Sequence, residues 1–118
     1  MRRHPDLVPL SREHHAPLRL GRHLLAGQGR DDLAQMLPSL SAHFRHEERT
    51  LLPVLEAHAE HALASRLRGE HETLASLLAA ASRGECMAQA GRALIDHVRF
   101  EERVLFPCLE ALFEETVP

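Results

Sequence analysis

The sequence HVRFEERVLFP at residues 97–107 occurs in a second, closely similar copy, HFRHEERTLLP at residues 43–53. The two copies align without a gap, and in each a histidine stands four residues before a glutamate. Residues four apart on a helix lie about 40° apart around its axis, so this histidine and this glutamate point the same way, one turn apart. An apolar core has no need of such a pair at fixed spacing. Its repetition therefore suggests a metal site shared by two helices, built from His43 with Glu47 and His97 with Glu101.

The composition favours a single helical domain. A chain of 118 residues can bury one modest core. The absence of Trp and Tyr argues against a β-sandwich or barrel, whereas the abundance of Ala, Leu, Glu and Arg favours helices. The net charge of −3, with acidic and basic residues interspersed, gives no basic face for nucleic acid. No apolar window is long enough to span a membrane, so we expect neither a nucleic-acid nor a membrane partner.

The chain is expected to be cytoplasmic. Its first residues, MRRHPDLVPL, lack the apolar run that is typical of a signal peptide. Cys86 and Cys108 fall on one predicted helix, about 33 Å apart at the helical rise, which is too far for a disulfide within that helix. Thiols that stay reduced are typical of the cytoplasm.

Apolar residues at helical spacing predict four helices. Ser11 is expected to cap the first, which runs to about Ala26, and residues 1–10 are expected to form an irregular arm. The other helices are expected over about residues 31–57, 62–82 and 87–115. Prolines inside them should each bend or interrupt a helix: Pro17, Pro38, Pro53 and Pro107. Four helices joined by short loops predict an all-α fold, an up-down-up-down four-helix bundle over residues 11–115.

Two further histidines complete the repeat, because Glu13-His14 and Glu70-His71 occupy matching places in the first and third helices. Residues of antiparallel neighbours lie at one height when they are equally far from the turn. The glycine-rich loop at 27–29 lies midway between His14 and His43, and Gly84 lies midway between His71 and His97. All these side chains are thus expected at one level of the bundle. We predict the following metal ligands: His14, His43, Glu47, His71, His97 and Glu101.

His15 competes with His14 for the place in the first helix. With His14 facing inward, the residue one turn on is Leu18, whereas with His15 inward it is Arg19. The repeat also aligns His14 with His71, so we favour His14.

Other polar residues near the motifs have open roles. His46 is matched by Phe100 in the second copy, so we expect it beside the site at most. Glu48, Glu72 and Glu102 are expected either to be solvated or to orient a ligand histidine. The competing interpretation of the whole cluster is a purely polar site, in which each buried glutamate pairs with a protonated histidine.

The predicted donor set suits two metal ions. Four imidazoles and two bridging carboxylates, with a bridging hydroxide or oxide, leave about two positions of two octahedral ions open for water or a small ligand. No thiolate lies near, which disfavours an iron–sulfur cluster or a cysteine-bound zinc site. Imidazole and carboxylate with open positions suit non-haem iron, and manganese or zinc could occupy the site in vitro.

Over about residues 10–113 the chain resembles the hemerythrin-like family of HHE cation-binding domains. The motifs that carry the resemblance are Glu13-His14, Glu70-His71 and the two His-x-x-x-Glu-Glu-x-x-Leu-x-Pro segments at 43–53 and 97–107. The resemblance implies a helical bundle with a di-iron site bridged by Glu47 and Glu101. It also implies a small ligand such as O₂, NO or peroxide.

Two departures from the oxygen-carrying members bear on function. Those members have a histidine one turn after the one on the third helix, where this chain has Ala75. They also have His-x-x-x-x-Asp on the last helix, where this chain has His97-x-x-x-Glu101. The chain is thus more similar to hemerythrin-like sensor domains, which favours sensing or handling of oxygen, redox state or iron, with a protein partner for signalling. A di-iron oxidase or peroxide-consuming enzyme, and oxygen carriage or storage, are the alternatives.

Overall fold

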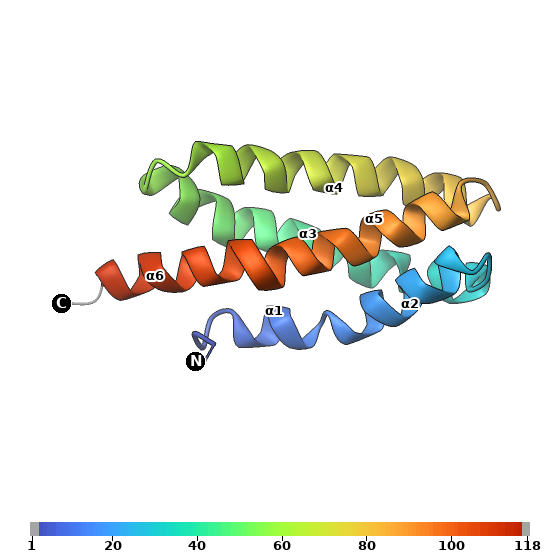
Figure 1. Ribbon diagram of the computed structural model, residues 1–118, viewed down its shortest axis with the longest axis horizontal. Helices are drawn as coiled ribbons and strands as arrows, with labels where there is room; N and C mark the ends of the chain where they lie inside the picture. Colours follow the sequence, from blue (N-terminus) through green and yellow to red (C-terminus); the bar gives the residue numbers. More distant parts are fainter. Residues whose placement is uncertain (1–2, 117–118) are drawn as a thin grey trace.

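The computed structural model describes residues 3–116 as a bundle of four long helical rods, 50 × 25 × 21 Å in extent (Figure 1). The first rod is broken and the last is bent through a π-helical turn. No strand occurs among the residues described. The elements are α1 (Val8–Arg12), α2 (His15–Leu25), α3 (Arg30–Ala57), α4 (His61–Ser82), α5 (Met87–Phe100), the π-helical turn η1 (Glu101–Leu105) and α6 (Phe106–Thr116).

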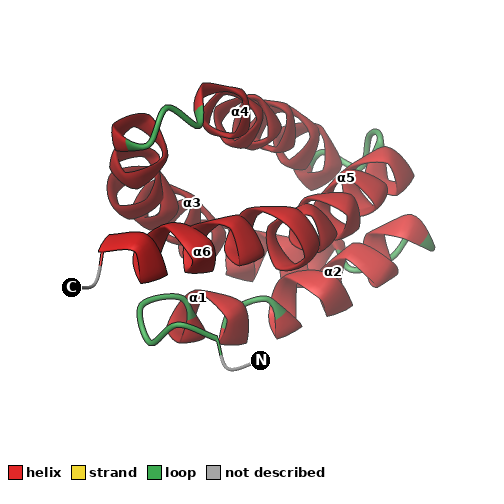
Figure 2. Cartoon of the chain, turned by 60° about the vertical axis from the view of Figure 1, so that its left-hand side comes forward, coloured by secondary structure: helices red, strands yellow, loops and turns green. Residues whose placement is uncertain are grey.

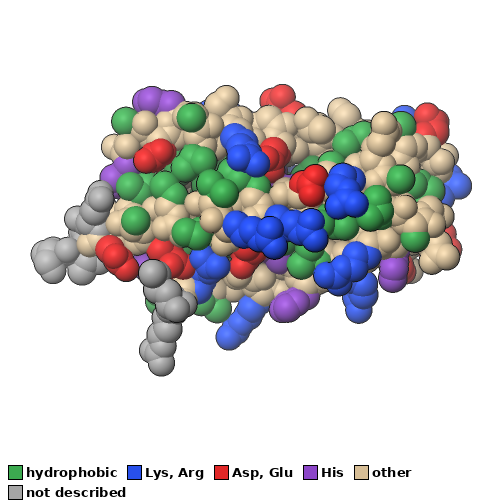
Figure 3. Space-filling model, in the orientation of Figure 1, with side chains coloured by type: hydrophobic (Ala, Val, Ile, Leu, Met, Phe, Trp, Pro, Cys, Tyr) green, Lys and Arg blue, Asp and Glu red, His purple; other side chains and the backbone are tan. Residues whose placement is uncertain are grey.

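Successive rods run in opposite directions, which confirms the predicted all-α, up-down-up-down bundle (Figures 1 and 2). The α2 rod lies along α5, and α3 lies along α4 on the other side of the bundle. On the face shown in Figure 3, arginine side chains form a band over α5 and α2, with acidic and apolar side chains between them. No helix within residues 3–116 is both long and apolar enough to cross a membrane.

The N-terminal segment differs from the irregular arm expected over residues 1–10, because α1 begins at Val8. Leu7 and Leu10 are buried in the core, and Pro9 sits in the first turn of α1, where a missing amide proton has no cost. Burial of these two leucines draws the segment onto the bundle. Ser11 therefore lies inside α1 and is no N-cap, contrary to the expectation.

The prolines act differently from one another. Pro38 and Pro53 lie inside α3, which is assigned as one continuous helix and is not split into segments there. The first rod is interrupted not at Pro17 but at Glu13 and His14, so that Pro17 falls in the first turn of α2.

The last rod changes before Pro107, in the π-helical turn. Phe106 donates its amide proton to the carbonyl oxygen of Glu101, one residue further than in an α-helix. Pro107 is then the second residue of α6, directly after the π-helical turn, and it has no amide proton to donate to that turn.

Two apolar layers enclose the level at which the motif histidines lie. One layer contains Leu10, Leu55, Leu67 and Phe106 near the two ends of the chain. The other contains Leu20, Leu33, Leu74 and Leu94 near the first and third loops. Water is thus excluded from above and below a polar layer in the middle of the bundle.

Candidate metal centre

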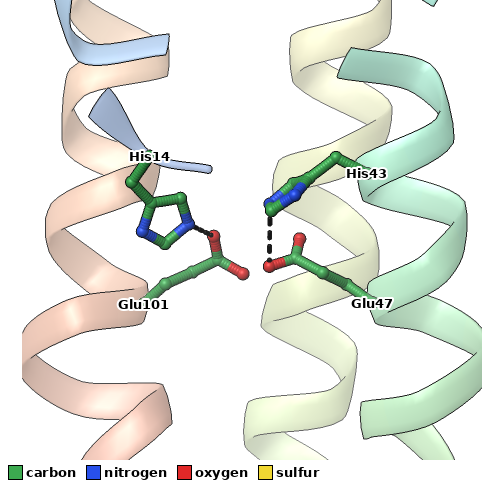
Figure 4. Close-up of side chains that lie close together, drawn as sticks. All are labelled: His14, His43, Glu47 and Glu101. Atoms are coloured by element: carbon green, nitrogen blue, oxygen red, sulfur yellow. Dashed lines mark hydrogen bonds and ion pairs between the residues drawn. The ribbon is translucent and has the colours of Figure 1, made fainter. Parts of the chain in front are cut away.

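Six polar side chains meet in the middle of the bundle, between the two apolar layers. Each is at most 8% exposed, although none is apolar. Figure 4 shows His14 and Glu101 on one side pointing toward His43 and Glu47, which both come from α3, on the other. These are the six residues singled out from the sequence: His14, His43, Glu47, His71, His97 and Glu101.

Local backbone structure aims each of these side chains inward. His43 and Glu47 lie one turn apart on α3, as the four-residue spacing predicts. His14 lies at the break between α1 and α2. Glu101 is the first residue of the π-helical turn, a type of distortion that is common at functional sites.

The Nε2 atoms of the four histidines face the two glutamates. His14 Nε2 lies 3.0 Å from Glu101 Oε1, and His71 Nε2 lies 3.1 Å from Glu47 Oε1. The nitrogens of His43 and His97 each lie 3.3 Å from the glutamate four residues on. Nitrogen and carboxylate atoms from four rods thus converge on one small volume.

The Nδ1 atoms face outward, and each meets another glutamate. His43 Nδ1 lies 2.6 Å from Glu13, and His97 Nδ1 lies 2.6 Å from Glu70. The other two pairs cross between the halves of the chain: His71 with Glu48 at 2.8 Å, and His14 with Glu102 at 3.1 Å. An Nδ1–H that donates to a carboxylate leaves the Nε2 lone pair directed inward and fixes the ring, which is the arrangement found around metal-bound histidines.

The pKa values of the central groups reflect the crowding of carboxylates. Burial opposes a charge on His97, but Glu101 and Glu47 outweigh it and raise its pKa to about 11. Burial likewise opposes a charge on His43, whose pKa Glu47 nevertheless raises to about 9. Burial raises the pKa of Glu101, and the adjacent Glu47 raises it further. Burial also disfavours the charge on Glu47, yet the neighbouring Glu101 carboxyl group and the surrounding histidines hold its pKa well below the usual value. The cluster therefore stabilises added positive charge.

Four central atoms distinguish a metal site from a purely polar one. Among the described residues, His43 Nε2, His97 Nε2, Glu47 Oε2 and Glu101 Oε2 are buried and have no hydrogen-bond partner. Such atoms are costly in a closed polar network, since each loses its water without replacement. Cations bound among these side chains would give each of the four atoms a partner, so the donor set fits metal binding and the purely polar interpretation is disfavoured.

The ligand atoms form two groups that overlap. One atom from each of His14, His43, Glu47 and Glu101 lies within 4.8 Å of the others, and the same holds for Glu47, His71, His97 and Glu101. The two glutamates belong to both groups.

Comparison with known proteins agrees with this geometry. A family model described as the hemerythrin HHE cation-binding domain matches residues 6–109, nearly the whole chain. The chain belongs to the hemerythrin HHE cation-binding family. The resemblance inferred from the sequence motifs is confirmed. Neither the curated proteins nor the solved structures that were searched gave a match.

The six central residues of this HHE domain all lie within the matched range, and they fit the binding of a metal cation. The residues whose roles the sequence left open differ from the six central residues in burial. His15, His46 and Glu72 are exposed and lie outside the buried cluster. Ala75, one turn after His71, is also exposed on α4.

Four outer glutamates of the HHE domain orient the central histidines. Glu48 and Glu102 were among the residues expected to be solvated or orienting, and both contact a histidine. The same role of Glu13 and Glu70 was missed. Their places immediately before His14 and His71 were a usable signal, because a repeated acid beside a repeated histidine suggests a shared role.

Proposed function

We propose that this HHE domain holds two iron ions, each between two histidines and both glutamates. The supporting observation is the pair of overlapping ligand groups. One ion would lie with His14 and His43, the other with His71 and His97, and Glu47 and Glu101 would bridge them. Two buried carboxylates at the boundary would then balance the charge between the two cations.

Iron is favoured by the chemistry of the donors. Imidazole and carboxylate without thiolate are typical of non-haem iron sites, and manganese or zinc can compete for such donors in vitro. Neither Cys86 nor Cys108 belongs to the ligand groups. When bound, the iron supplies a redox-active centre that can react with a small molecule such as O₂, NO or peroxide. The chain's own residues fix the histidine rings and exclude water above and below the site.

We propose sensing or handling of oxygen, redox state or iron as the role, with reversible carriage of O₂ as the alternative. The donor set supports this, because each ion would have two histidines of its own and the two shared carboxylates, and position 75 provides no further imidazole. The sequence contains no Tyr or Trp, the side chains that usually transfer radicals, so an oxidase is less favoured. A cytoplasmic location, which we also propose, is supported by the positions of Cys86, directly before α5, and Cys108, in α6, which lie about 33 Å apart at the helical rise, too far to form a disulfide with each other. Signalling would require a partner protein.

Oxygen cycling tests this role. Protein loaded with ferrous iron under anaerobic conditions is expected to oxidise once on exposure to air and to stay oxidised when oxygen is removed. The near-ultraviolet and visible spectrum reports the change, and a chemical reductant should restore the starting spectrum. Repeated, reversible spectral change with oxygen alone, over many cycles, would instead establish oxygen carriage or storage.

A further inference from the structure

A chain of contacts closes on itself at the outer edge of His97. Its Nδ1 atom lies 2.6 Å from Glu70 Oε1, and Glu70 Oε2 accepts a hydrogen bond of 2.8 Å from Arg66 Nε. The Arg66 guanidinium lies over the Phe100 ring, 3.9 Å from its centroid, and that ring lies 6.4 Å from the imidazole of His97. In this group of residues, the His97 cluster, the glutamate is held by an arginine that an aromatic ring holds in turn.

A second group of the same composition, the His14 cluster, surrounds His14. Its Nδ1 atom lies 3.1 Å from Glu102, and Arg3 Nη2 lies 3.4 Å from the other oxygen of that carboxylate. The Arg3 guanidinium lies 5.5 Å from the centroid of the Phe106 ring, which stacks on His14 at 5.6 Å. Glu110 fixes this arginine further, at 2.9 Å from Nη1. The His14 cluster therefore repeats the contacts of the His97 cluster, although its arginine precedes α1 and does not lie in α4.

The other two histidines have no such cluster among the residues described. Glu13 meets His43 at 2.6 Å and Glu48 meets His71 at 2.8 Å, but neither glutamate has a further hydrogen bond or ion pair there. Their side chains are 55% and 40% exposed, more than those of the glutamates in the two clusters, at 25% and 31%. Phe44 stacks on His71 at 4.5 Å, but no described arginine lies over it. Each of these histidines thus depends on a glutamate with no second partner.

The sequence explains why both clusters form on the last rod. Phe100 and Phe106 flank η1 in the second motif copy, whereas the matching residues of the first copy are His46 and Leu52. A guanidinium stacks on an aromatic face and gains nothing comparable from leucine, and His46 is exposed. The first copy therefore lacks the two surfaces on which the arginines lie.

We propose that Arg3 and Arg66 are positioning residues, one for each metal position. The inference rests on the proposed dinuclear site, in which His14 and His97 belong to different ligand groups. Each arginine holds an outer glutamate and thereby sets the ring of one histidine before the metal arrives, which lowers the cost of ordering that ligand. Each ion therefore meets one preset histidine from the side of α2 and α5, and then draws in a freer one from α3 or α4.

Ring mobility in the metal-free protein tests this inference without any assay of activity. Protein labelled with ¹⁵N in its histidines is expected to give narrow ring-nitrogen signals for His14 and His97. The signals of His43 and His71 should be broadened, because ring motion on the microsecond-to-millisecond timescale broadens a signal. Substitution of each histidine by glutamine in turn assigns the signals.

Two substitutions test the arginines separately. Arg3→Met and Arg66→Met each keep an apolar stem over the phenylalanine but remove the charge. The first should broaden the signals of His14 alone, and the second those of His97 alone. In titrations with Co²⁺, followed by the visible spectrum and the bound metal, each variant should bind one ion about 10-fold more weakly and the other within about twofold of the wild type. The lysine substitutions Arg3→Lys and Arg66→Lys should recover part of the loss, because they restore the charge beside the glutamate.

Arg12→Met and Arg68→Met are the matched controls. Arg12 is exposed in α1 and forms no ion pair with the residues described, and Arg68 lies in α4 and pairs only with the exposed Glu56. Both controls should leave the ring signals and the metal affinity unchanged. Circular dichroism shows in each case that the variant is folded.

Three results would overturn the inference while the dinuclear site stands. These are equal ring mobility of the four histidines in the metal-free wild type, broadening of all four by either methionine substitution, and a loss of affinity in the controls as large as in the Arg3 and Arg66 variants. Saturation of the wild type at fewer than two ions would instead overturn the proposed function, and the inference with it.

Discussion

Two pairs of neighbouring helices form opposite walls of the bundle, α2 with α5 and α3 with α4. The two walls differ in the residues at which their helices meet. Gly21 and Gly91 face each other across α2 and α5, and a Cβ atom on Gly91 would come within 2.5 Å of the Gly21 carbonyl oxygen. Gly21 stands seven residues after His14, and the residue seven after the equivalent His71 is Leu78. Gly91 stands six residues before His97, and the residue six before the equivalent His43 is Leu37. One wall therefore brings two backbones into contact, and the other is filled by leucine side chains.

Despite this difference, both walls present their histidines at the same level. His97 and His43 each lie one turn before a glutamate that faces the centre, and each has an outer glutamate on Nδ1. The repeat is thus strict where side chains converge on the site and relaxed where helices pack. This is the pattern expected when the ligand geometry constrains the sequence more tightly than the packing does.

The largest expected effect concerns the central glutamates, of which each half of the chain supplies one. Glu47→Ala and Glu101→Ala, one from each half, should each reduce bound metal to near zero after dialysis, because each removes a donor from both ligand groups. Glu48→Ala and Glu102→Ala leave the central donors in place and remove a contact to a histidine Nδ1, so metal affinity should fall about 10- to 100-fold. Equal losses in all four variants would contradict the division into central and outer glutamates.

The next largest effect concerns how much bound metal stabilises the fold, to which both halves of the chain contribute ligands. Removal of the metal by a chelator should lower the free energy of unfolding by about 4 kcal/mol when the metal had been present at about a thousand times its dissociation constant. The reason is that four buried central atoms lose their partner. Thermal unfolding with and without chelator measures the difference. An unchanged midpoint would mean that these atoms find other partners.

A smaller effect tests the glycine contact itself. Gly91→Ala should destabilise the protein by about 3 kcal/mol, because the added methyl group meets the backbone of α2. Gly69 is the matched control, since it lies within α4 and a Cβ atom there meets nothing within 4 Å. Gly69→Ala should stabilise the protein by about 0.5–1 kcal/mol through helix propensity. Denaturant unfolding measures both, and similar values for the two variants would remove the distinction between the walls.

The smallest effect concerns the anchor of Glu102. Ser11→Ala removes the hydroxyl that lies 2.7 Å from both Glu102 oxygens and should cost about 1 kcal/mol of stability. Ser76→Ala, at an exposed helical position, carries the same gain in helix propensity and serves as the control. The difference between the two variants isolates the hydrogen bond, and no difference would show that Ser11 does not hold Glu102.

Sequence reasoning predicted the bundle and the meeting of the six central residues, because both depend on periodicity and on distances from the turns. Helical spacing fixes the side that His43 and Glu47 share, and the loops fix the common level of His14 and His71.

Features that depend on contacts between distant segments were not predictable in this way. The start of α1 depends on the burial of Leu7 and Leu10 against other helices. The repeated places of Glu13 and Glu70 signalled a shared role, but the histidine that each one meets depends on the direction in which its side chain crosses to the next rod.

The π-helical turn is the clearest example of a feature that the sequence did not predict. Pro53 and Pro107 occupy the same place in the two motif copies, yet α3 continues through the first as an α-helix, and only the second is preceded by a π-helical turn. A proline in the motif therefore does not by itself determine the turn.

The central claim is that Glu47 and Glu101 are shared by two metal ions. A crystal structure of the protein loaded with iron under anaerobic conditions, with anomalous scattering recorded at the iron edge, tests it most directly. The expected result is two iron peaks per chain, one beside His14 and His43 and the other beside His71 and His97, with both glutamates between them. A single peak, or iron bound away from this buried layer, would contradict the account.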